Sequence, residues 1–283
     1  MSSIIDSHHH LWNYSEAEYG WISPEMSALR RDFTPQMLFP ELTSVGIDGT
    51  VAVQARQTLA ETDWLLSLAE NSPFIKGVVG WFPLSDPALE NEIDLRLRFS
   101  ASVRLVGVRH VVQDEPDPLF ILGDDFNRGV DILERYGLIY DILVAEHQLP
   151  AAMEFVDRHP NQFFVLDHAA KPRIAAEELE PWSANLSELA RRGNVSCKVS
   201  GIVTEANWNS WTPESLKPYL DRIFEAFGPR RLMFGSDWPV CLLAAEYREW
   251  YQTVKSYCAG LSPDEQEWVF GRSAELMYGL EEL

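Results

Sequence analysis

The chain has 283 residues, of which 46% are hydrophobic and 23% charged, a balance typical of globular proteins with a large core. This composition excludes a disordered chain or a coiled coil as the main description. The 43 acidic residues outnumber the 23 basic ones and give a formal net charge of −20. Such a negative surface repels nucleic-acid phosphates and anionic lipid, so we expect neither as a partner.

Short apolar runs rich in Val, Ile and Phe alternate with longer stretches of helical character along the whole chain. Runs of this kind are typical of parallel strands that are buried on both faces. The predicted strands are residues 4–12, 50–55, 75–84, 106–113, 138–145, 163–169, 195–202 and 232–240.

Helix starts are visible between these strands. Thr34 and Thr212 each place a capping hydroxyl before a proline, and Ser262 and Glu265 form a capping box before the last helix. Eight strands alternating with helices predict one α/β domain over residues 1–283, a single (β/α)8 TIM-type barrel. The alternative, an open doubly wound sheet, lacks its Gly-rich fingerprint after the first strand.

The three cysteines are an odd number without C-x-x-C spacing, which favours a reducing compartment over a disulfide framework. The first residues show no secretory signal pattern, and no stretch has the apolar length that a membrane span needs. We therefore expect a cytoplasmic protein without a membrane partner. The oligomeric state stays open, with a homodimer as one alternative.

Histidines gather where such a barrel places its active site, at the carboxyl ends of the strands. Six of the seven lie in or just after predicted strands, three of them in the first, at His8, His9 and His10. Side chains alternate along a strand, so His8 and His10 share a face, about 7 Å apart. They can converge on a metal ion or a carbonyl oxygen. A polar surface cluster is the alternative reading, and His9 is expected to be structural.

Two other strand ends carry groups that suit the same site. Asp237 follows the last apolar run and precedes Pro239, where it can ligate a metal or act as a general base, or merely cap a turn. The sixth strand ends in Asp167 and His168, and alternation lets only one of them face the interior. We expect His168 to be the third ligand, with Asp167 accepting a hydrogen bond behind it.

Four further residues are predicted to bind substrate. Arg109 and His110 are neighbours on the fourth strand, and the sequence leaves open which of them faces the barrel mouth. An arginine there can hold a carbonyl or carboxylate oxygen. Lys171 lies at a strand end, and Trp81 can stack on a sugar ring, although core packing is the default for a tryptophan. Lys198, also at a strand end, suits a structural salt bridge at least as well as catalysis.

These motifs resemble a known family. Asp6-x-His8-x-His10, the histidine after the sixth strand and the segment 235–239 are similar to the amidohydrolase superfamily. Segments 108–117, 166–172 and 197–201 resemble, more narrowly, its sugar-lactonase branch, which includes L-fuconolactonases, L-rhamnonolactonases and pyrone-dicarboxylate lactonases. The resemblance extends from Asp6 to about Tyr278.

The resemblance implies an enzyme that hydrolyses a small-molecule sugar lactone to the aldonic acid. It assigns the catalytic and metal-binding positions to His8, His10, His168 and Asp237, with Asp237 as general base, and a substrate-binding role to Arg109. The fourth strand has no lysine that could be carboxylated to bridge two metals. One Zn2+ ion or no metal at all are therefore the alternatives. A decarboxylase or isomerase of a small organic acid, or a non-catalytic sugar-binding barrel, are the competing functions.

Overall fold

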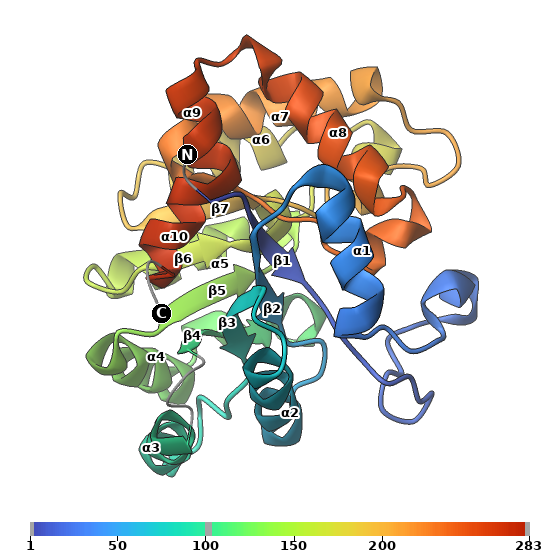
Figure 1. Ribbon diagram of the computed structural model, residues 1–283. Helices are drawn as coiled ribbons and strands as arrows, with labels where there is room; N and C mark the ends of the chain where they lie inside the picture. Colours follow the sequence, from blue (N-terminus) through green and yellow to red (C-terminus); the bar gives the residue numbers. More distant parts are fainter. Residues whose placement is uncertain (1–2, 100–103, 281–283) are drawn as a thin grey trace.

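The computed structural model describes residues 3–99 and 104–280, and within them eight parallel strands form one sheet in the order β1 to β8 (Figure 1). The strands are β1 (Ile5–His9), β2 (Gly49–Val53), β3 (Ile75–Gly80), β4 (Arg104–Val111), β5 (Ile139–Leu143), β6 (Phe164–Leu166), β7 (Val195–Val199) and β8 (Leu232–Phe234). This strand order, with helices between successive strands, confirms the predicted (β/α)8 barrel.

The barrel closes between the first strand and the segment that follows the last. The amide of His10 donates to the carbonyl of Trp238 at 2.6 Å, and the amide of Asp237 donates to the carbonyl of His8 at 2.8 Å. The ends of the first and last strands therefore meet beside the residues that carry the predicted chemistry.

Helices surround the strands (Figure 1). They are α1 (Pro35–Val45), α2 (Leu59–Glu70), α3 (Leu89–Phe99), α4 (Asp124–Tyr136), α5 (Leu149–Arg158), α6 (Trp182–Leu189), α7 (Pro213–Phe227), α8 (Tyr247–Tyr257), α9 (Pro263–Glu267) and α10 (Ser273–Tyr278). The predicted caps at Thr212 and Ser262 are confirmed, because both hydroxyls accept a backbone N–H. The predicted cap at Thr34 is wrong in one respect. Thr34 does precede α1 directly, but its hydroxyl accepts no backbone N–H there.

All eight strands end two to six residues earlier than the sequence indicates, and after β6 and β8 the polar tail leaves the strand direction. β6 ends at Leu166 and β8 at Phe234. Beyond them, φ lies between 47° and 58° at the four residues from His168 to Lys171, and at 56° at Asp237. Non-glycine residues rarely adopt positive φ, and where they do the surrounding structure must hold them in place.

The inside of the barrel is filled by Val, Ile and Met side chains from seven of the described strands, and Ala274 and Tyr278 of α10 pack against them. α10 covers the end at which the strands begin, where Leu280 approaches Gly77 at the start of β3. β7 instead turns the fully buried Lys198 toward the interior. Among the described residues, no helix is both long enough and apolar enough to span a membrane.

Candidate active site

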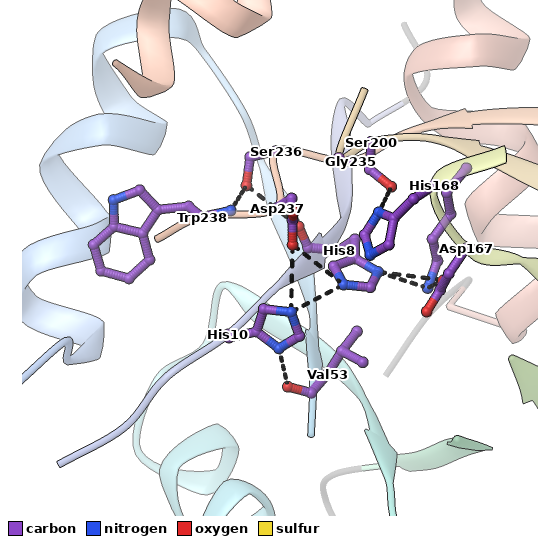
Figure 2. A network of polar contacts seen from close by, with 12 residues as sticks. His8, His10, Val53, Asp167, His168, Ser200, Gly235, Ser236, Asp237 and Trp238 are labelled. Carbon is purple, nitrogen blue, oxygen red and sulfur yellow. Dashed lines mark hydrogen bonds and ion pairs between the residues drawn. The ribbon is translucent and has the colours of Figure 1, made fainter. Parts of the chain in front are cut away.

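Three histidines and one aspartate from three strand ends meet at the carboxyl end of the barrel (Figure 2). His8 Nε2 lies 3.1 Å from His10 Nε2, and Asp237 Oδ1 lies 3.7 Å and 3.4 Å from these two nitrogens. The ring of His168 packs edge-on against that of His8, with centroids 4.6 Å apart. The structure therefore brings together the four residues that the sequence assigned to the site.

The charges of this cluster follow from burial. Burial lowers the pKa of His168 to about 4 and that of His8 well below its ordinary value, so both imidazoles are neutral near pH 7. Burial alone raises the pKa of Asp237, but His168 and the contact with His10 outweigh it and hold that pKa below its usual value. Neutral His8 and His168 thus face one ionised carboxylate.

Hydrogen-bond partners set the proton positions on His8 and His10, at the end of β1. His10 Nδ1 donates to the carbonyl of Val53 at 2.8 Å, so the Nε2 of a neutral His10 is an acceptor (Figure 2). Lys198 Nζ lies 3.1 Å from His8 Nδ1 and can donate to it, which leaves the proton of His8 on Nε2, pointing at His10. His9 faces the other way and contacts Thr50 Oγ1 at 2.9 Å, in agreement with a structural role.

A glycine after β7 makes room for His168. Gly201 has a φ of +64°, and a Cβ at this position would lie 2.5 Å from His168 Nδ1. His168 Nδ1 also contacts Ser200 Oγ at 2.9 Å (Figure 2). The ring orientation of His168 therefore depends on the two residues that follow β7.

We expect Gly201→Ala to lower both stability and turnover. An alanine in the left-handed region costs about 1–2 kcal/mol, and its methyl group would displace His168 from its place beside His8. Gly137→Ala is the matched control, because Gly137 has a φ of +66° but a Cβ there would meet nothing within 4 Å. Thermal melts should show a loss for both variants that is larger for Gly201→Ala, and kcat should fall for Gly201→Ala alone; equal kcat values would contradict the role of Gly201.

Behind the histidines lies a buried network of charges. Asp167 pairs with Arg109 Nη1 at 2.9 Å and with Lys198 Nζ at 2.9 Å. Lys198 also binds Asp141, which accepts a hydrogen bond from the Tyr278 hydroxyl at 2.9 Å. Burial raises the pKa of Asp141 to about 6, whereas Lys198 outweighs burial at Asp167 and holds its pKa well below the usual value.

The prediction that only one of Asp167 and His168 faces the interior is wrong. The alternation rule holds along a strand, but β6 ends at Leu166, so Asp167 and His168 lie in an irregular turn that directs both toward His8. Lys198 lies in a buried ion-pair network, as its structural interpretation required, and that network contacts the histidine cluster.

A cavity of about 820 Å³ opens above this cluster. His10, His168, Asp237, Arg109 and Lys171 line it, while His8 is fully buried behind them.

Trp81 and His110 are not among the described lining residues of that cavity. Side chains alternate along β4, so Arg109 faces the cavity and His110 faces away, where it stacks on Phe120 and contacts Glu115. Trp81 Nε1 donates to His110 Nδ1 at 3.2 Å. We therefore leave Trp81 and His110 out of the proposed site.

Sequence reasoning missed several residues around the site. Asp141 left a usable signal, because it is a single carboxylate inside an otherwise apolar strand. Trp21 lines the cavity from a loop and Glu205 from a short helix after β7, and Tyr278 reaches the buried network from α10. Periodicity carries no information about such loop positions.

The donor atoms fit one divalent ion. One atom each of His8, His168 and Asp237 lies within 4.8 Å of the other two, and nitrogen and carboxylate donors are ligands that Zn2+ accepts. β4 contains no lysine that could bridge a second metal. Without an ion, His8 Nε2 contacts His10 Nε2 and His168 Nδ1 contacts Ser200 Oγ.

The sequence matches the amidohydrolase family over residues 5–280. The chain belongs to the amidohydrolase family. This amidohydrolase is 42% identical to an L-fucono-1,5-lactonase of Burkholderia multivorans, over 98% of this chain and 96% of that protein. It is 36% identical to an L-fucono-1,5-lactonase of Burkholderia ambifaria, over 99% of this chain and 97% of that one.

A solved structure supports the same relationship. An amidohydrolase from Burkholderia multivorans with bound zinc is 41% identical to this amidohydrolase and superposes with a TM-score of 0.93 over 98% of this chain and 99% of that chain. The resemblance to the sugar-lactonase branch is therefore confirmed.

Proposed function

We propose that this amidohydrolase opens a sugar lactone of the L-fucono-1,5-lactone type to the aldonic acid. The observation that carries the proposal is the ionised Asp237 beside neutral histidines at the base of a cavity of about 820 Å³. The 42% identity to an L-fucono-1,5-lactonase over nearly the whole chain supports this substrate class.

Asp237 is the base of the proposed reaction. Its carboxylate takes a proton from water, and the water oxygen then forms a bond to the lactone carbonyl carbon. When the tetrahedral intermediate collapses, the bond from the carbonyl carbon to the ring oxygen breaks. The proton on Asp237 passes to that ring oxygen, which gives the acid and restores the carboxylate.

His168 and Arg109 are the groups best placed to stabilise the developing oxyanion. With the Ser200 hydroxyl donating to Nδ1 of His168, Nε2 of that ring carries the proton and is free for the substrate. Arg109 lines the cavity and is held there by Asp167. Fixed donors of this kind need no reorganisation when charge develops, which is why they lower the barrier.

The residues that would hold a divalent ion are His8, His168 and Asp237. Bound there, an ion such as Zn2+ would polarise the lactone carbonyl and lower the pKa of water.

The direct test is acid release from a panel of lactones, with spontaneous hydrolysis subtracted. The panel contains the 1,5- and 1,4-lactones of L-fuconic, L-rhamnonic, L-galactonic and D-arabinonic acids, assayed on chelator-treated enzyme with and without Zn2+. We expect fastest turnover of the L-fucono-1,5-lactone. Activity that returns only with Zn2+ would show that the histidines hold a metal ion. Equal activity with and without Zn2+ would show that they act through hydrogen bonds.

The competing functions give other results in the same experiment. Release of carbon dioxide or formation of an isomer from a small organic acid would replace the proposal by the decarboxylase or isomerase alternative. Thermal stabilisation by the lactones without turnover in either arm would replace it by a sugar-binding barrel.

A further inference from the structure

Each cation of the cavity wall faces a carboxylate. Among the described lining residues, three are cations and four are carboxylates: Arg56, Arg109 and Lys171 against Glu18, Asp114, Glu205 and Asp237. Arg109 is paired with Asp167, and Arg56 with both Glu18 and Glu61, at 2.6–2.9 Å. These two cations are therefore neutralised by close contacts.

The third pair is different, because its two groups do not touch. Lys171 Nζ and Glu205 Oε1 are 3.7 Å apart, which is longer than a hydrogen bond. Both side chains are 27% exposed and line the cavity. Each group therefore keeps hydrogen-bonding capacity for a third partner in the cavity.

The pair also lies close to the proposed reaction centre. Lys171 ends the left-handed turn that begins at His168, and Glu205 belongs to a short helix after β7. Burial raises the pKa of Glu205, Lys171 lowers it, and the Asp237 carboxylate raises it further, as expected for a carboxylate that faces the same cavity.

We propose that Lys171 and Glu205 bind the hydroxyl groups of a neutral lactone and, through Glu205, disfavour lactones that carry a carboxylate. This inference rests on the proposed function and assigns the substrate chemistry that the site selects. An ammonium donates, a carboxylate accepts, and a sugar hydroxyl can do both. A ligand carboxylate would instead face the carboxylates of Glu205 and Asp237, and like charges repel.

The test compares wild type with Glu205→Gln and Lys171→Met on three lactones. These are L-fucono-1,5-lactone, the hydroxyl-free ring δ-valerolactone, and the carboxylate-bearing D-glucaro-1,4-lactone. For L-fucono-1,5-lactone we expect both variants to raise KM by about tenfold or more with little change in kcat, since a charge-assisted hydrogen bond is lost. For δ-valerolactone, kcat/KM should change by less than about twofold, and Glu205→Gln should increase kcat/KM for the glucarolactone.

Asp221→Asn is the matched control, because it breaks the Lys217–Asp221 pair on the exposed side of α7. It should leave all three rates unchanged. If wild type does not open δ-valerolactone, competitive inhibition by 1,5-anhydro-L-fucitol, which carries ring hydroxyls without a carbonyl, replaces that arm. Both variants should then raise its inhibition constant.

The two proposals fail in different ways. If wild type opens no lactone, the proposed function fails and this inference fails with it. If wild type opens L-fucono-1,5-lactone but the variants lose the same factor on δ-valerolactone, or bind the anhydro sugar as wild type does, the Lys171–Glu205 inference alone is overturned.

Discussion

Replacing Asp237 by asparagine is expected to lower kcat by about 10²–10⁴-fold, because the amide cannot take a proton from water. KM should change little, since the side chain keeps its size and acts on water rather than on the substrate hydroxyls. Asparagine tolerates the φ of 56° found at this position, and the backbone bond from residue 237 to the His8 carbonyl is retained.

Acid release under saturating lactone measures this effect, and thermal melts check that the fold is intact. Asp221→Asn, on the outer surface of α7, is the control for the same chemical change. Turnover close to wild type in Asp237→Asn would show that another group acts as the base.

Lys198→Met is expected to cost about 3–5 kcal/mol of stability, because it leaves the buried Asp141 carboxylate without a cation and Asp167 with Arg109 alone. Lys198 is fully buried and pairs with both Asp141 and Asp167. The melting temperature should fall on the order of 10 °C. Turnover should also fall, since His8 loses the donor at Nδ1 that fixes its tautomer.

Two further variants separate this explanation from a loss of packing. Lys217→Met removes a lysine from an exposed ion pair and should change stability by no more than about 1 kcal/mol. Adding Asp141→Asn to Lys198→Met removes one uncompensated charge while keeping an acceptor for Tyr278. The double variant should be more stable than Lys198→Met alone, and purely additive losses would contradict a charge origin.

Hydrophobic patterning was enough to predict the barrel, because parallel strands buried on both faces give continuous apolar runs that are visible in one sequence. The four central residues were also predictable. His8, His10, His168 and Asp237 all lie within or directly after such runs, where the barrel places its active site.

Side-chain direction beyond the strand ends was not predictable. Two-residue alternation holds along β4, where it places His110 away from the cavity, but β6 already ends at Leu166. The left-handed residues from His168 to Lys171 that follow β6 obey no periodic rule. Glu205 and Tyr278 reach the site through loop geometry and helix docking, which depend on contacts between segments far apart in the sequence.

The hydrogen bond from Tyr278 to Asp141 has a consequence for the order in which the protein matures during synthesis. The histidines at the end of β1 emerge first, but Asp237, which they contact, follows the last strand, and Tyr278, which binds Asp141, lies in the last helix. A growing chain therefore carries an open barrel with an incomplete charge network for most of its synthesis. Catalytic competence should arrive in one late step, when β8 closes against β1 and α10 docks beneath the strands.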